Sequence, residues 1–160
     1  MIDVRDYTAS IVGSLGPICC VYVIFAAVAK RTKIGISKNI RSRFSALQTD
    51  SPEELTIEYI LWCLDGKNVA IDIEQKCHEV IGGYHSHGEW FYVPPKFAIE
   101  KIEDIRDRFY PKREKFYTHQ EFIEKTTDRA KILAESANRR GGLTASELDA
   151  LRKIQRSGYI

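Results

Sequence analysis

A large excess of charge of either sign is missing from this sequence. Its 160 residues include 24 lysines and arginines and 22 acidic residues, which gives a formal net charge of +2. Composition alone therefore does not indicate a nucleic-acid binder, and any such inference depends on where the charges lie. Residues 30–43 contain no acidic residue and have six cations, which are Lys30, Arg31, Lys33, Lys38, Arg41 and Arg43. This segment is the most positive part of the chain.

A Cys-x-x-Cys pair is also missing. The Cys-x-x-Cys spacing of zinc and redox sites does not occur among the cysteines, which are Cys19, Cys20, Cys63 and Cys77. Three of the four lie in apolar segments, so we interpret them as small core residues in a reducing compartment. A disulfide or a zinc set stays the alternative. We accordingly expect an intracellular, cytoplasmic protein.

A long unbroken apolar run is absent as well. Residues 11–29 are uncharged and are followed by two cations, as a membrane anchor would be. Gly16 and Pro17 interrupt the run, however, and favour a turn that leads into a strand. Asp3 and Asp6 stand where a secretory signal would carry positive charge. We expect no membrane segment, and a protein tethered through residues 11–29 is the alternative.

Hydrophobic periodicity predicts the element order β-β-α-β-α-β up to residue 95. The expected elements are strands at 18–27 and 33–36 joined by a turn at 30–32, a helix capped by Ser37 that ends near 48, a strand at 55–64, a helix at 67–81 and a short strand within 88–95. The first strand is dense in apolar residues, which is typical of a strand covered on both faces. In the third strand, alternation places five side chains on one face: Leu55, Ile57, Tyr59, Leu61 and Cys63. Gly82 and Gly83 are expected to stop the second helix in the left-handed conformation.

The rest of the chain is charged and helical in pattern. Ile99, Ile102 and Ile105 recur at helical spacing, residues 138–142 break the pattern, and Thr144 begins a capping box for a last helix. We therefore predict an α+β fold with a mainly antiparallel central sheet flanked by helices. Its expected parts are an N-terminal segment at 1–17, a compact domain at 18–95 and a helical C-terminal extension at 96–160.

Five motifs of the compact domain occur in an order that resembles a known family. Val21-Tyr22-Val23 and Lys33-Ile34-Gly35 lie on the two hairpin strands, a helix with Arg43 follows, and a helix with Glu74 precedes the closing Gly-Glu-Trp-Phe at 88–91. This arrangement resembles the GIY-YIG nuclease superfamily, in particular its phage-type branch.

The resemblance implies a metal-dependent DNA endonuclease that hydrolyses one phosphodiester bond and leaves 5′-phosphate and 3′-hydroxyl ends. By position, Tyr22 would be the general base, and Lys33 and Arg43 would lower the pKa of its phenol. Arg43 would also stabilise the phosphate in the transition state through its fork of donors. Glu74 would hold a single Mg²⁺, or Mn²⁺ in its place.

Further residues have supporting roles in this hypothesis. Phosphate contacts are expected from the exposed cations around the hairpin, namely Lys30, Arg31, Lys38 and Arg41. His78 lies one helical turn beyond Glu74 and would support it. His85 and His87 have a spacing that also occurs freely in loops, so we expect a loop there, with zinc as the alternative. Glu89 is expected to close the core and cap the sheet.

Two departures from the family pattern keep a second function open. Lys33 stands where the superfamily has its second tyrosine, and no asparagine follows Glu74 at the place where many members have one. The alternative is therefore a catalytically inactive DNA-binding module of the same fold.

Overall fold

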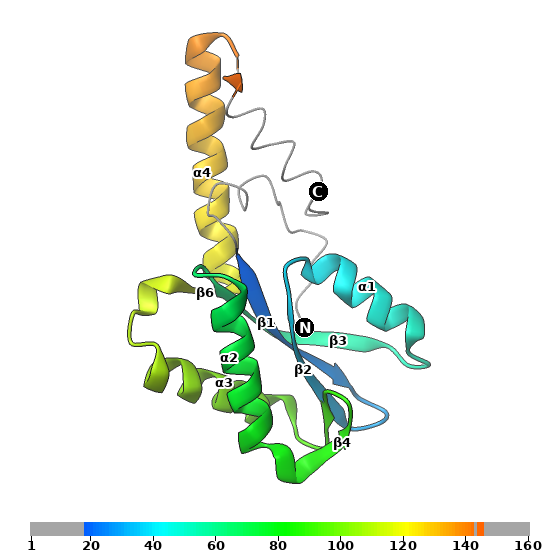
Figure 1. Cartoon of the computed structure of the whole chain (residues 1–160). Coiled ribbons are helices and arrows are strands. Elements are labelled where there is room, and N and C mark those ends of the chain that lie inside the picture. The colour runs from blue at the N-terminus through cyan, green and yellow to red at the C-terminus, as the bar shows by residue number, and fades with distance from the viewer. Residues whose placement is uncertain (1–17, 143, 146–160) are drawn as a thin grey trace.

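The computed structural model describes residues 18–142 and 144–145, and these form an α+β fold built on one six-stranded sheet (Figure 1). The strand order is β4-β5-β2-β1-β3-β6, and each pair of neighbours is antiparallel. The strands are β1 (Cys19–Ala26), β2 (Arg31–Ser37), β3 (Leu55–Cys63), β4 (His85–His87), β5 (Trp90–Phe91) and β6 (Phe116–Thr118). The helices are α1 (Ile40–Asp50), α2 (Lys67–Val80), α3 (Pro95–Phe109) and α4 (His119–Arg140), with single 3₁₀ turns η3 (Gly82–Tyr84) and η4 (Arg113–Lys115). The predicted fold class is confirmed.

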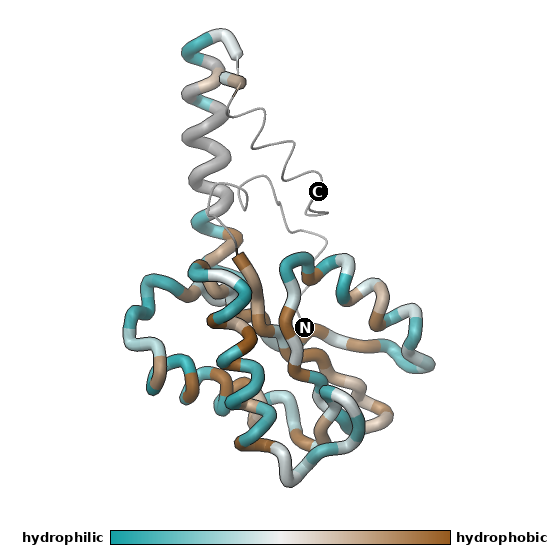
Figure 2. The backbone as a smooth tube through the Cα atoms, viewed as in Figure 1, coloured by the Kyte–Doolittle hydropathy of each residue, from teal (hydrophilic) through white to brown (hydrophobic). Residues whose placement is uncertain are grey.

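Both faces of the central strand β1 are buried. Tyr22 and Ile24 lie on the face covered by α1 and α4, whereas Val21 and Val23 lie on the face covered by α2 and α3. Figure 2 accordingly shows hydrophobic residues along the central strands and hydrophilic ones along the outer helix turns. Burial on two faces explains why this strand reads as an apolar run instead of an alternating one.

A β-bulge in β3 makes one prediction wrong. Val23 pairs with Tyr59, and the next residue of β1 pairs with Ile57. Glu58 is therefore an extra residue. It shifts the alternation of side chains between the two faces of the sheet by one residue. Leu61 consequently lies on the opposite face from Ile57, although alternation had placed the two together.

The hairpin turn comes earlier than expected. Strand β2 already begins at Arg31, so the turn occupies residues 27–30 instead of 30–32. The carboxylate of Glu53 accepts hydrogen bonds from the backbone N–H groups of Val28 at 2.7 Å and Ala29 at 3.1 Å. Lys30 takes a positive φ of 52° at the end of the turn. A side chain distant in sequence thus fixes this turn, and the local sequence does not reveal it.

Helix α1 begins later than expected and is attached to the sheet by a narrow face. Asn39, not Ser37, is its N-cap, and its side chain accepts a hydrogen bond from Ser42 N at 3.0 Å. Ile40 is the one fully buried residue of the helix, while Phe44 and Leu47 are partly buried against the core. The helix therefore stands along the edge of the domain (Figure 1).

The segment after α2 differs from the prediction in two details. The predicted helix at 67–81 is confirmed as α2, but Gly82 and Gly83 form the 3₁₀ turn η3 and do not adopt a left-handed conformation. His85–His87, expected in a loop, pairs with β5 as strand β4. Gly88, with a φ of 54°, makes the tight turn between these two short strands.

The helical stretch after residue 95 contributes to the same core. Ala98, Ile102 and Ile105 of α3 are buried with α2 against the sheet. Strand β6, which the sequence pattern did not indicate, extends the sheet beside β3. Helix α4 docks on the other face, where Phe122 stacks on Trp62 with ring centroids 4.2 Å apart, and then projects beyond the sheet (Figure 1).

The predicted break at 138–142 is confirmed at its glycines. Gly141 and Gly142 follow α4 with φ values of 76° and 156°. The predicted last helix after Thr144 and the predicted segment 1–17 lie outside the described residues. Within the described part of the chain, no helix is long and apolar enough to cross a membrane, and residues 19–26 of the apolar run form a strand.

Candidate active site

The candidate site begins at the centre of the sheet, where Tyr22 of β1 lies opposite Gly35 of β2. The tyrosine ring is fully buried and lies directly over this glycine. A β-carbon added at Gly35 would come within 2.4 Å of the Tyr22 oxygen. The glycine of the Lys33-Ile34-Gly35 triplet is therefore required because the phenol occupies the space of a side chain.

Arg43 of α1 reaches this phenol from the neighbouring helix. Its Nε donates a hydrogen bond to the Tyr22 oxygen at 3.2 Å. The Arg43 side chain keeps 44% of its surface exposed, so one edge of the guanidinium binds the tyrosine while the rest stays open to a ligand. The structure thus brings together two residues that lie 21 positions apart in the sequence.

Lys33 and Glu89 form an ion pair beside them. The Nζ of Lys33, whose side chain is only 6% exposed, lies 2.5 Å from Oε2 of Glu89. The same carboxylate oxygen is 3.9 Å from Nη2 of Arg43. Glu89 is therefore held between the two cations that the sequence assigned to the site.

Glu89 is the residue that sequence reasoning missed, because it was expected only to close the core. It directly precedes β5, and β5 pairs with β2 at Lys33. Its backbone oxygen also accepts a hydrogen bond from Ile34 N at 3.2 Å. The available signal was an acid at the start of a short strand, but the register that brings it to a lysine 56 residues away is not encoded locally.

Glu74 of α2 belongs to the same electrostatic neighbourhood. Burial and the negative charge of Glu89 raise its pKa to about 7, whereas Lys33 acts in the opposite direction. The helix approaches from the other face of the sheet, past the edge of β2. Glu74 therefore joins the site through charge, while Tyr22 and Arg43 join it through direct contact.

His78 shows why α2 can reach this edge. Strand β5 pairs with β2 only at Thr32 and Lys33, so the next residues of β2 have a strand on the β1 side but none on the side of β5. The Nε2 of His78 lies 3.0 Å from the backbone oxygen of Ile34 and occupies this gap. Burial lowers the pKa of His78. The side chain anchors α2 one turn beyond Glu74, and its supporting role in a reaction stays a prediction.

The pKa of Tyr22 differs from the expectation that nearby cations would lower it. Burial raises it to about 12 and outweighs the hydrogen bond and charge of Arg43, which act to lower it. The negative charge of Glu89 raises it further. At neutral pH the phenol is therefore protonated in this state of the protein.

The other predicted cations lie at both ends of β2 and do not form a single cluster. Lys30 and Arg31 are at the hairpin turn, whereas Lys38 and Arg41 are at the start of α1. The seven residues of β2 separate these pairs by roughly 20 Å, with the site between them. Their arrangement suits a chain of phosphates that crosses the site, and their contact with DNA stays a prediction.

The histidines and cysteines do not form a zinc site. Nε2 of His85 lies 2.9 Å from the backbone oxygen of Gly88, and Nδ1 of His87 lies 3.1 Å from Nη1 of Arg31. The four cysteines are buried as free thiols, as expected of core residues. Within residues 18–142, 144 and 145, no group of three or more metal-ligating side chains converges.

Glu74 and Glu89 are the carboxylates that fit a hard divalent cation. They repel one another, and Glu74 is half-buried, so a positive ion near both would relieve an electrostatic cost that the isolated protein carries. Mg²⁺ is commonly held by one or two carboxylates and keeps several water ligands. The donor set therefore suits Mg²⁺ better than a cation that requires a complete protein cage.

Replacement of Gly35 with alanine is expected to destabilise the fold by about 1 to 3 kcal/mol, because the added methyl group must displace the Tyr22 ring from a packed face. Urea denaturation measures this change. Gly83→Ala is the matched control, since a β-carbon there meets no atom within 4 Å. Equal stability of Gly35→Ala and the wild type would mean that the ring does not lie over Gly35.

The part of the chain that contains the site matches the model of a known protein family. The model of the T5orf172 domain matches residues 19–110, which run from β1 past the end of α3 and contain each of the site residues described above. No curated protein and no solved structure matches the chain. The match extends over more than half of the 160 residues. The chain therefore belongs to the T5orf172 domain family.

Proposed function

We propose that the protein is a metal-dependent endonuclease of the GIY-YIG type that hydrolyses a phosphodiester bond of DNA. The observation that carries this proposal is the contact between Arg43 and Tyr22 beside the Lys33–Glu89 pair. Membership in the T5orf172 family supports it, because this phage-associated domain is found in GIY-YIG and HNH-like nucleases.

Phosphodiester hydrolysis needs positive charge where oxygen atoms become more negative in the transition state. Arg43 provides it through the part of its guanidinium that Tyr22 does not use, and it binds a phosphate oxygen there. Lys33 provides a second charge, fixed by its burial. Glu89 lies between the two cations and must yield its place to the phosphate or turn toward a bound cation.

Glu74 is the proposed ligand of a single Mg²⁺ or Mn²⁺, with Glu89 close enough to share the field of the ion. A bound divalent ion would supply Lewis acidity and lower the pKa of nearby water and phenol groups. Without that charge, Tyr22 is protonated at neutral pH and holds Arg43 in place. As the proposed general base, it therefore has to be deprotonated in the loaded complex.

A DNA-binding module without turnover is the second candidate. The pKa of about 12 for Tyr22 favours it, because the phenol is not ionised in the resting site. The pairing of Lys33 with Glu89 favours it as well, because it offsets a positive charge that would otherwise face the phosphate. The cations at the two ends of β2 would still bind phosphates in this case.

Incubation of the protein with supercoiled plasmid distinguishes the two. We expect nicked and linear DNA with Mg²⁺ or Mn²⁺ and intact plasmid with EDTA, because hydrolysis needs the ion held by Glu74. Binding is measured in parallel by fluorescence anisotropy at increasing salt. Salt-sensitive binding with no cleavage in either metal would support the module and contradict the nuclease.

A further inference from the structure

A cavity lies on the same face of the sheet as the candidate site, nearer the hairpin turn. Its volume is about 220 Å³. It lies between the end of α1, the hairpin turn side of β1 and β2, and the β4–β5 hairpin, and its lining includes Arg31, Leu47, Asp50, Pro52, His87 and Trp90. None of the proposed catalytic or metal-binding residues lines this cavity.

One wall of the cavity combines an aromatic ring with a fixed cation. The guanidinium carbon of Arg31 lies 5.9 Å from the centre of the Trp90 ring. The same guanidinium is held by Nδ1 of His87 at 3.1 Å. Indole rings and guanidinium planes are the groups on which proteins stack unpaired nucleobases.

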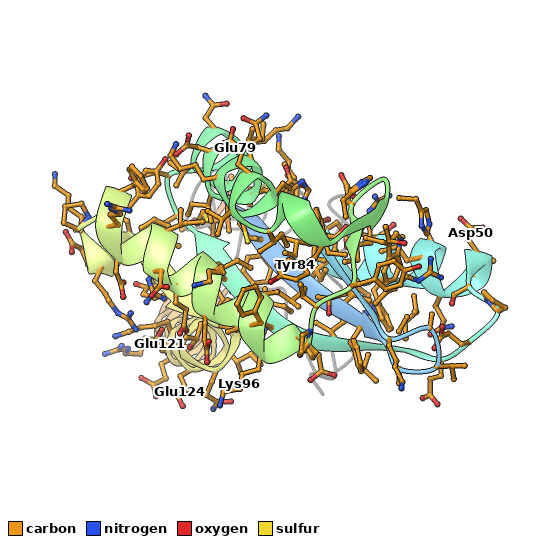
Figure 3. All side chains as sticks on the ribbon, turned by 90° about the horizontal axis from the view of Figure 1, so that it is seen from below. Asp50, Glu79, Tyr84, Lys96, Glu121 and Glu124 are labelled. Atoms are coloured by element: carbon orange, nitrogen blue, oxygen red, sulfur yellow. The ribbon has the colours of Figure 1, made fainter. Side chains whose placement is uncertain are left out.

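The rest of the lining combines apolar and polar residues of α1, β1, β3 and the loop after α1. Leu47 and Pro52 supply the apolar part, and Asp50 lies at the end of α1 (Figure 3). The loop that follows α1 is fixed by Gln48, whose amide donates to Glu53 O at 2.9 Å and accepts from Leu55 N at 2.8 Å. The cavity is therefore formed before a ligand arrives, as small-molecule sites usually are.

The cavity adjoins the proposed phosphate site. Trp90 lines the cavity and also lies 5.7 Å from Nζ of Lys33. Arg31 and Lys33 are alternate residues of β2, so their side chains leave the same face about 7 Å apart. A nucleotide whose phosphate binds near Lys33 can thus place its base beside Arg31.

We infer that this cavity binds a single unstacked nucleobase of the DNA strand whose phosphate lies at Arg43 and Lys33. The inference rests on the proposed function and specifies its substrate. A base inside a regular duplex is stacked on both sides and does not enter such a cavity, so the favoured DNA has an unpaired base next to the scissile bond. Single strands, bulges and branch points provide one.

The test uses 2-aminopurine deoxyribonucleoside 5′-monophosphate in EDTA, where no cleavage occurs. Stacking on Trp90 quenches the fluorescence of this probe, so titration with the protein is expected to show saturable quenching. Leu47→Phe narrows the cavity and is expected to weaken binding about tenfold, in the range of one base-stacking interaction. The control is Ala46→Phe, on the exposed side of the same helix, which is expected to bind as the wild type does.

Each outcome decides the inference. Absence of quenching, or equal binding by Leu47→Phe and the wild type, overturns it. Displacement of the probe by inorganic phosphate from both proteins at equal concentrations would also overturn it, because the phosphate alone would then account for binding. Trp90→Leu gives an independent check. It removes the quenching ring, so quenching of the probe should be lost, and unchanged quenching would overturn the inference. Plasmid cleavage without probe binding would contradict the nucleobase site and leave the proposed nuclease function standing. Probe binding without plasmid cleavage would support the nucleobase site and contradict the nuclease function.

Discussion

Replacement of Arg43 with lysine is expected to lower the rate of plasmid nicking by about 10²- to 10³-fold. Lysine keeps the positive charge but cannot donate from Nε to Tyr22 while it binds a phosphate with its remaining donors. The side chain is 44% exposed, so the fold should remain intact. The measurement is the initial rate of nicking with Mg²⁺, compared between purified variant and wild type.

Arg41→Lys is the matched control for this variant. Arg41 lies two residues earlier on α1 and is exposed, so the change is the same in chemistry and close in position. Lysine keeps the positive charge that the predicted phosphate contact of Arg41 needs, so the nicking rate should stay near that of the wild type. Equal effects at both positions would mean that the loss does not depend on the contact between Arg43 and Tyr22, and the catalytic role of Arg43 would be wrong.

Replacement of Glu74 with glutamine is expected to abolish Mg²⁺-dependent cleavage and, at the same time, to stabilise the metal-free protein at alkaline pH. The pKa of Glu74 is raised from 4.5 to about 7 in the folded protein. Its contribution to stability is therefore fully present below pH 4.5 and is lost as the pH rises through 7. Because the group is half-exposed, we expect a gain of about 1 to 2 kcal/mol for the variant at roughly pH 8.

Urea denaturation at acidic and alkaline pH, without divalent ions, measures this effect. Glu79→Gln is the control, because Glu79 lies on the same helix and points away from the sheet (Figure 3). Added Mg²⁺ should stabilise the wild type and not the Glu74 variant, since only the wild type keeps the charged ligand. A Glu74 variant that still cleaves, or one that is no more stable than Glu79→Gln at alkaline pH, would contradict the assignment.

The sequence predicts the elements of this fold well where the local pattern of apolar residues decides them. Helix α2 appears at the expected position because its apolar residues recur with the helical period, and strand β1 appears there because its short apolar run is rich in β-branched residues. The bulge at Glu58 escapes such reasoning, since it depends on how β3 pairs with β1 and not on local preference. Strand β4 escapes for the same reason, because three residues that include two histidines have no strand periodicity.

The candidate site was predicted in part. Resemblance, not periodicity, selected Tyr22 and Arg43, and the structure brings these two into contact. It could not identify Glu89, whose partner Lys33 becomes a neighbour only through the two-residue pairing of β5 with β2. The predicted shift in the pKa of Tyr22 was wrong in direction. Burial depends on packing from the whole sheet, and its effect on the pKa exceeds that of one nearby cation.

The narrow attachment of α1 has a consequence for the energetics of the site. Ile40 is the only residue of that helix with a completely buried side chain, whereas β1, on which Tyr22 lies, is buried throughout its centre. Local unfolding of α1 therefore costs far less free energy than global unfolding. Transient release of the helix would withdraw the arginine from the tyrosine and leave the sheet intact. The two halves of the proposed catalytic pair therefore belong to parts of the molecule with very different hydrogen-exchange lifetimes.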